Sequence, residues 1–532
     1  NATVIFAQAS AAGTLRDFVK VLIPAAQQYV KPILYIHADL HNWVLEEKQW
    51  ADNITRLQLE TIDEVFPPVQ VSIDGGENPS FYFDRRLEDE NWKIPESDGK
   101  GVAWAVQGGG EGNDKIRGIT ATADGGVLVT GEITEDCYFG GHELECKGAL
   151  DFFAAKIDSG GRVMWATSAG GPGIDRGYSV AAGPDDSCIV TGHFESERFV
   201  LGEMELESAG DYDGFVARFN KKGVCTWARR FGGAGYDYGH GIVGMKGGGF
   251  VVSGAITGTG TFRDMAIEGD SRKHAVLGRI SPAGRWLWAK GIGAASISGH
   301  QVTVGAYDSI YLAGYSKGKV TWSKDVETQS AVQDIFVANF DEAGNFQWVR
   351  NAGGKSDGVA TSIAVDEATG NVAIAGMFKA EATFGEKTFT SQGGHDFFTA
   401  VFSGLGEPLG ASHGAGEGTD YGLDIVSGDG GFVATGEFSD VAEFAGQTLK
   451  GGGERDAWVA KIAADGSGVE VIKVLGGTDN DLSYCVATTT DGAAVVAGAF
   501  RNVSTMGTTT LESAGGNDLF ITKVIFDDDE KK

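Results

Sequence analysis

The chain has 532 residues, including 82 glycines and only 10 prolines, and its net charge is −30. Glycine at about twice its usual share, without a Gly-X-Y period, excludes collagen. A hydrophobic content of 42% excludes a disordered linker. The sequence has no run of about 20 apolar residues that could cross a membrane, and its negative charge argues against nucleic-acid binding.

Residues 1–86 combine strand and helix patterns. Buried-type strands are expected at "TVIFAQ" and "PILYIHAD", with helical apolar spacing from Leu15 to Ile23 between them. Strands are also expected at "NITRLQLE", "PVQVSID" and "FYFDRR". This order predicts a small α/β segment, which is short for a complete layered domain.

The stretch "KPILYIHADLHNW" with the strands after it resembles the carboxy-terminal half of calcineurin-like metallophosphoesterases. In a subgroup of that family, a strand beginning Lys-Pro runs into a His-Gly-Asp-x-His loop at the metal centre. The resemblance implies that His37, Asp39 and His41 contact divalent metal ions or a phosphate group. Alanine replaces the loop glycine at position 38.

The family's other ligand motifs would lie upstream of Asn1. Phosphoester hydrolysis is therefore expected only if an upstream half-domain exists, and otherwise the segment is a degenerate remnant. A missing upstream segment or a partner chain is expected to cover the sheet edge of residues 1–86. Residues 87–100, "LEDENWKIPESDGK", read as an acidic linker.

Residues 101–526 contain seven repeats of about 61 residues. A glycine that ends an apolar strand recurs every 60 to 62 residues, at Gly131, Gly192, Gly254, Gly314, Gly376, Gly436 and Gly498. A tryptophan series keeps the same period at Trp104, Trp165, Trp227, Trp288 and Trp348, and Leu409 and Val471 continue it. An acidic residue two before an aromatic recurs at Asp151, Asp213, Asp334, Asp396, Asp456 and Asp518, with His274 in the remaining copy.

Each repeat has short strands separated by Gly, Asp and Asn turns, with a Gly-Gly turn expected after the tryptophan strand. Four strands in each of seven units predict a mainly β fold, a seven-bladed β-propeller. A β-solenoid is the alternative. The motifs "GGPGID", "IVTG" and "DGFVARF" resemble the bacterial-type seven-bladed propeller repeat. Residues 527–532 form a charged tail.

The Gly-Gly-x-Gly-x-Asp turns resemble calcium-binding RTX nonapeptides, which implies calcium in some of them. The other interpretation is that each aspartate caps its own turn. The candidate residues are Asp114, Asp175, Asp237, Asp357, Asp420 and Asp481.

Aromatic residues near the ends of the repeat strands predict a propeller face that holds a glycan or peptide. These residues are Tyr236, Tyr238, Tyr421 and Tyr484. Cys137 and Cys146 are close enough in sequence to form a disulfide across a hairpin. Cys188, Cys225 and Cys485 lie in apolar stretches typical of core residues.

Two functions remain open from the sequence. The first is an extracellular or surface protein whose propeller is a binding scaffold attached to a phosphoesterase-type domain. The second is a non-catalytic structural or adhesive component of an extracellular assembly or filament. Sequons at Asn1, Asn53 and Asn502 favour secretion weakly.

Overall fold

The computed structural model divides the chain into two compact units, Asn1–Ile94 and Pro95–Lys532. It describes residues 101–526, except 294, 295 and 355, and six strands of the first unit. The predicted helix at residues 15–23, the linker and the tail lie outside the described residues. No described helix is long and apolar enough to span a membrane.

The first unit contains a four-stranded sheet in the order β1-β2-β4-β3. Its strands are β1 (Thr3–Gln8), β2 (Ile33–Ala38), β3 (Val44–Glu47) and β4 (Ile54–Leu59). β1, β2 and β4 are parallel, and β3 is antiparallel to β4. β5 (Gln70–Ile73) and β6 (Phe81–Asp84) form a separate antiparallel pair. Five of these six strands lie where the sequence patterns predict them, whereas β3 was not predicted.

The described part of the second unit is a succession of antiparallel sheets in which four strands lie side by side. The innermost strands are β8 (Lys115–Ala121), β14 (Asp175–Ala182), β20 (Tyr238–Gly244), β26 (Ser296–Val304), β30 (Gly358–Val365), β36 (Tyr421–Gly428) and β40 (Asp481–Thr488). The second strands are β9 (Val127–Ile133), β15 (Cys188–Phe194), β21 (Phe250–Thr257), β27 (Ile310–Ser323), β31 (Val372–Phe378), β37 (Gly431–Phe444) and β41 (Ala494–Met506).

The outer half of each sheet follows the same order. The third strands are β12 (Asp151–Ile157), β18 (Asp213–Phe219), β24 (Lys273–Ile280), β28 (Val326–Phe340), β34 (Asp396–Phe402), β38 (Gln447–Ala463) and β42 (Thr509–Val524). The outermost strands are β13 (Val163–Ala169), β19 (Cys225–Gly233), β25 (Trp286–Ile292), β29 (Phe346–Gly354), β35 (Pro408–Gly416), β39 (Val469–Gly477) and β7 (Val102–Gly110). A 3-10 turn at Ala306–Asp308 precedes β27.

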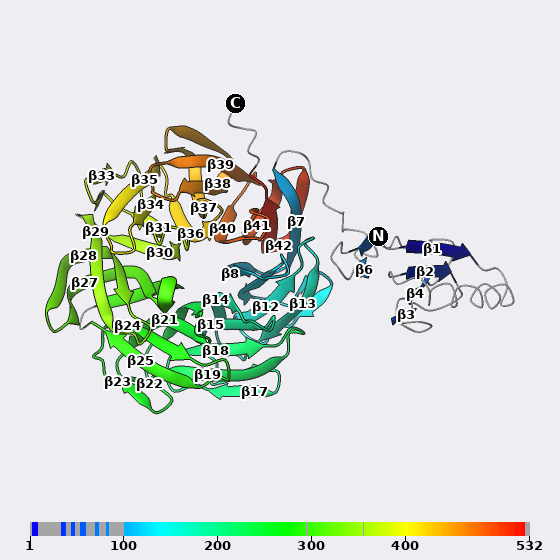
Figure 1. Cartoon of the computed structure of the whole chain (residues 1–532), viewed down its shortest axis with the longest axis horizontal. Coiled ribbons are helices and arrows are strands. Elements are labelled where there is room, and N and C mark those ends of the chain that lie inside the picture. Colours follow the sequence, from blue (N-terminus) through cyan, green and yellow to red (C-terminus); the bar gives the residue numbers. More distant parts are fainter. Residues whose placement is uncertain are drawn as a thin grey trace. The chain divides into compact units, whose positions relative to one another are not determined.

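The sheets close into a ring (Figure 1). Each innermost strand contacts the innermost strand of the next sheet, and β40 contacts β8. The last sheet takes its outermost strand from the start of the repeats, because β7 pairs with β42 from Val102↔Val524 to Gly108↔Leu519. The described fold is therefore mainly β and of propeller type, and its antiparallel sheets exclude the β-solenoid.

Hairpins between the second and third strands connect neighbouring sheets. Short ones are β10 (Cys137–Phe139) with β11 (His142–Leu144), β16 (Arg198–Leu201) with β17 (Met204–Glu207), β22 (Gly260–Phe262) with β23 (Met265–Ile267), and β32 (Glu381–Phe384) with β33 (Lys387–Thr390). β10 pairs with β7, β22 with β19 and β32 with β29, each the outermost strand of the preceding sheet.

These hairpins correct the predicted Gly-Gly turn. In the third repeat, Gly232 pairs with Thr261 and Gly233 with Gly260, so both glycines belong to β19. A Cβ on Gly233 would lie 2.1 Å from the carbonyl oxygen of Thr259. The glycines therefore extend the strand and let the next hairpin approach its backbone.

Tryptophans of the outermost strands pack on the following sheet. Trp165 in β13 lies over Gly223, a positive-φ residue in the turn between β18 and β19. The same contact recurs in the pairs Trp104/Gly161, Trp227/Gly284, Trp288/Gly344 and Trp348/Gly406. Trp104 and Trp227 also donate their indole N–H to the next sheet, to the carbonyl oxygens of Ser159 (3.0 Å) and Pro282 (3.1 Å).

Gly223→Ala should destabilise the second unit more than an ordinary turn substitution. The new Cβ would lie 2.7 Å from Trp165 Cε3, in addition to the cost of a positive φ. Gly492→Ala is the matched control, because Gly492 has a φ of 79° and no atom within 4 Å of its Cβ position. Chemical denaturation should show a further loss of about 1–3 kcal/mol in Gly223→Ala. Equal losses in the two variants would contradict this contact.

Candidate functional site

The aspartates predicted in the glycine-rich turns begin or immediately precede innermost strands. Asp114, Asp175, Asp237, Asp420 and Asp481 are buried, whereas Asp357 is exposed. Asp175 accepts hydrogen bonds from the backbone N–H of Gly171 (2.8 Å) and from the hydroxyl of Ser196 (2.7 Å). It therefore fixes its own turn and the loop after β15 at the same time.

A second buried aspartate accompanies most of these residues. Asp151, Asp396, Asp456 and Asp518 lie in third strands, and each interacts electrostatically with the turn aspartate of the next sheet. The pairs are Asp151/Asp175, Asp396/Asp420, Asp456/Asp481 and Asp518/Asp114. Burial, with a contribution from the partner's charge, raises the pKa of Asp114, Asp420 and Asp481 to about 7.

Several oxygens of these carboxylates have no hydrogen-bond partner among the described residues. They include Asp114 Oδ2, Asp518 Oδ1, Asp396 Oδ1 and Asp420 Oδ2. In the pair formed by Asp213 and Asp237, Arg230 supplies a cation, with its Nη1 2.6 Å from Asp213 Oδ1. Where the repeat lacks a turn aspartate, His274 replaces the third-strand aspartate. Cations act more weakly on two other pairs, where Lys147 lowers the pKa of Asp151 and Arg455 lowers that of Asp420, although burial outweighs both.

The Asp114→Asn variant should be less sensitive to pH than the native chain. The pKa of Asp114 is raised from 3.8 to about 7 by burial, so the folded protein binds more protons than the unfolded chain between these values. The free energy of unfolding therefore falls as pH rises through this window. Melting temperatures from pH 4 to 8 should decline less steeply in Asp114→Asn. Asp211→Asn, at an exposed site, is the control and should leave the slope unchanged.

Calcium binding by the turn aspartates stays a prediction. Among the described residues, no group of three or more His, Cys, Asp or Glu side chains is suited to a metal. A calcium ion would therefore need backbone carbonyl oxygens in addition to a carboxylate pair. If it binds, millimolar calcium should raise the melting temperature at pH 8, and Asp151→Asn should reduce that rise. Asp213→Asn, beside Arg230, should keep it, and no calcium effect on the native chain would contradict the hypothesis.

A cluster of charged residues lies at the centre of the ring. Glu132 in β9 accepts hydrogen bonds from Arg117 Nε (2.6 Å) and Nη2 (2.8 Å), and it also pairs with Arg176 of the next sheet. Burial alone would raise the pKa of Glu132, but the two guanidinium groups outweigh it and lower that pKa. Lys115 is within electrostatic reach of the same carboxylate.

Aromatic rings extend this cluster along the innermost strands. The Arg117 guanidinium lies 5.6 Å from the ring centre of Tyr484 and 5.8 Å from that of Tyr178. Tyr178 stacks on His240, and His240 stacks on His300. On the other side of Tyr484, Arg455 pairs with Glu437 at 2.5 Å. We call this set the inner-ring cluster: Lys115, Arg117, Glu132, Arg176, Tyr178, His193, His240, His300, Glu437, Arg455 and Tyr484.

The histidines of the inner-ring cluster are neutral at physiological pH. Burial, with the nearby arginines, lowers the pKa of His193 to about 3, and burial beside Lys273 lowers that of His300 to about 4. The His193 ring lies among the rings of Tyr178, Tyr212 and Tyr238. Neither of its nitrogens has a partner among the described residues. These imidazoles can offer hydrogen bonds but no positive charge.

The structure places the four predicted tyrosines in or near the inner-ring cluster. Tyr484 belongs to it, and Tyr421 lies 5.4 Å from Arg455. Tyr238 and Tyr236 contact Tyr212, and Tyr236 is 47% exposed. The charged members were missed from the sequence. Two of these charged residues could have been found from the sequence, because Glu132 and Glu437 directly follow the strand-end glycines of their repeats.

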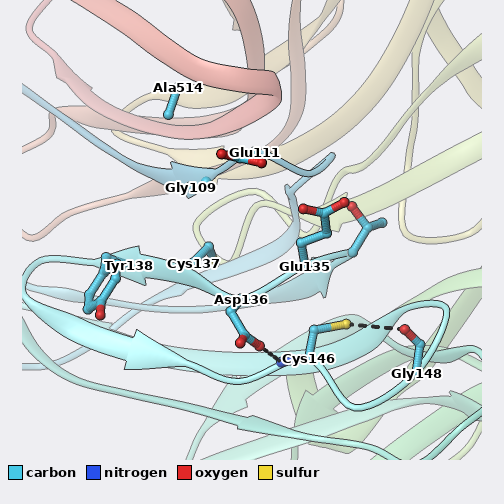
Figure 2. Close-up of a pocket in the computed structure, with 11 residues that line it drawn as sticks. Gly109, Glu111, Glu135, Asp136, Cys137, Tyr138, Cys146, Gly148 and Ala514 are labelled. Atoms are coloured by element: carbon cyan, nitrogen blue, oxygen red, sulfur yellow. Dashed lines mark hydrogen bonds between the residues drawn. The ribbon is translucent and has the colours of Figure 1, made fainter.

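A separate pocket of about 800 Å³ lies beside β7 and β10 (Figure 2). Glu111, Glu135 and Asp136 make its lining acidic. The predicted disulfide is wrong in this structure, because Cys137 and Cys146 are both free. Cys137 faces Leu144 across the hairpin, and Cys146 lies beyond the end of β11, where its thiol contacts the Gly148 carbonyl oxygen. Cys188, Cys225 and Cys485 are buried, as predicted.

The remaining sequence candidates are only partly covered by the described residues. His37 lies near the carboxyl end of β2, paired with Ala7 and Gln58. Asp39, His41, Asn1 and Asn53 lie outside the described residues. Asn502 is exposed, and its side chain donates a hydrogen bond to Asp479.

Comparisons with known proteins give no functional assignment. No protein-family model matches the chain, and no curated protein matches it. A similar solved structure is a predicted oxidoreductase (glucose dehydrogenase) from Thermus thermophilus. It is 12% identical, with a TM-score of 0.33, and the match covers 64% of this chain and 95% of that one. So weak a likeness carries no argument about function.

Proposed function

We propose that residues 101–526 form a seven-bladed β-propeller that serves as a glycan-binding module of an extracellular or surface protein. The observation that supports this most directly is the inner-ring cluster. It collects arginine, histidine and tyrosine side chains from several sheets at the end of the ring where the innermost strands begin. Propellers often carry their sites near the central axis, where loops and strand ends of many repeats converge.

The side chains of the inner-ring cluster suit a polyhydroxylated ligand. Tyrosine offers an apolar ring face together with a hydroxyl, and arginine and neutral histidine donate hydrogen bonds. The Arg455 side chain is 33% exposed and that of Arg176 is 24% exposed, so both are accessible from solvent. The unpartnered buried nitrogens on His193 and His240 leave hydrogen-bonding capacity for bound water.

The two wider roles drawn from the sequence are compatible with this binding function. A phosphoesterase-type role depends on His37, Asp39 and His41 and on an upstream segment, and the parallel order of β1, β2 and β4 suits an α/β domain. The alternative is a non-catalytic structural or adhesive component, which needs only the propeller. Both roles, with their divalent metal, protein partners and secreted location, remain proposals.

An array of neutral and acidic oligosaccharides tests the proposed function with the labelled full chain. Tyr484→Ala should lower binding to the preferred glycans at least tenfold, because it removes the ring beneath Arg117. Tyr138→Ala is the control, since Tyr138 is 59% exposed on the β10 hairpin, and it should bind normally. Circular dichroism verifies folding of each variant. No binding above background, or equal losses in the two variants, would overturn the proposal.

A further inference from the structure

The inner-ring cluster carries an excess of positive charge within a strongly acidic chain. Four cations, Lys115, Arg117, Arg176 and Arg455, accompany two carboxylates, Glu132 and Glu437, whereas the whole chain has a net charge of −30. By comparison, the exposed Arg198–Glu205 ion pair on the β16–β17 hairpin has one positive and one negative charge. A local excess of this kind attracts anions.

The arginines of this cluster are not equally occupied. Arg117 uses two of its nitrogens on Glu132, in the bidentate geometry that carboxylates favour. Arg176 shares the same carboxylate, and its Nη1 makes only a 3.3 Å hydrogen bond to the Tyr178 hydroxyl. One carboxylate therefore serves two guanidinium groups. The N–H groups of Arg176 have spare donor capacity among the described contacts.

Neutral hydrogen-bonding groups surround this charge. Tyr178 stacks on His240, and both lie on innermost strands next to Arg176. One nitrogen of His240 has no partner among the described residues. A ligand that complements the whole cluster would thus combine one oxyanion with several hydroxyl groups.

We infer that the inner-ring cluster binds the carboxylate of a sugar acid through Arg176, assisted by Lys115, which is within electrostatic reach of Arg176. This inference rests on the proposed glycan-binding function and specifies its ligand class. The carboxylate would take the donors of Arg176 that Glu132 leaves unused. The ring hydroxyls would face the histidine and tyrosine side chains. A free sugar acid and the terminal residue of a glycan share this chemistry.

Two trisaccharides of the same linkage, trigalacturonate and galactotriose, test the inference by calorimetry on the full chain. The acidic sugar should bind at least tenfold more tightly at low salt, and this preference should shrink as salt screens the charge. Arg176→Gln should abolish most of the preference, and Arg176→Lys should retain part of it. Arg198→Gln is the matched control and should bind as the native chain does. Melting temperatures verify that each variant is folded.

Competing ligands distinguish the possible sources of the anion. Monomeric galacturonate should compete with trigalacturonate if a single sugar acid suffices, and failure to compete assigns the site to a glycan. Inorganic phosphate should compete at least tenfold more weakly. Equal competition by phosphate, equal binding of the two trisaccharides, an unchanged preference in Arg176→Gln, or no binding of trigalacturonate would overturn the inference. Binding of neutral glycans on the array, lost in Tyr484→Ala, would leave the proposed function intact.

Discussion

Close packing between neighbouring sheets requires glycine, which has no side chain, at fixed positions of the repeat. Tryptophan of one sheet covers a turn glycine of the next in five pairs, from Trp104/Gly161 to Trp348/Gly406. Strand glycines such as Gly233 admit the neighbouring hairpin in the same way. Each position tolerates little more than a hydrogen atom, so the abundance of glycine reflects how closely the sheets approach. The tryptophan–glycine contact recurs between five pairs of neighbouring sheets.

Buried charge is distributed unevenly around this ring. Aspartate pairs hold the turns that enter the innermost strands, and burial raises the pKa of their carboxyl groups. Arginines collect instead at the centre, around Glu132 and Glu437. Desolvation disfavours charge in the aspartate pairs, whereas at the centre the guanidinium groups stabilise the ionised Glu132. One repeated fold thus supports two opposite electrostatic environments.

The repeat period, the strand positions and the burial of three cysteines could be predicted from the sequence, because apolar alternation and glycine spacing report local structure directly. The strand conformation of the Gly-Gly segments could not be predicted, because consecutive glycines are equally typical of a turn. Only the pairing with the neighbouring hairpin shows that these glycines belong to a strand. The pairing of Arg176 with Glu132 joins different sheets. Cys137 and Cys146 were close in sequence, but strand register placed Leu144 opposite Cys137.

The pairing of β7 with β42 joins residues more than 400 positions apart in the sequence. During synthesis, β7 emerges before the other strands of the ring and cannot find its partner strand until nearly the whole ring has been made. Until then the growing chain has open strand edges at its first and last sheets, the kind of edge that pairs readily with other chains. Contacts between such distant residues also form slowly. Closure is therefore the step at which a newly made ring is most exposed to misassembly, and the outermost strand that completes the ring is the first of its strands to be synthesised.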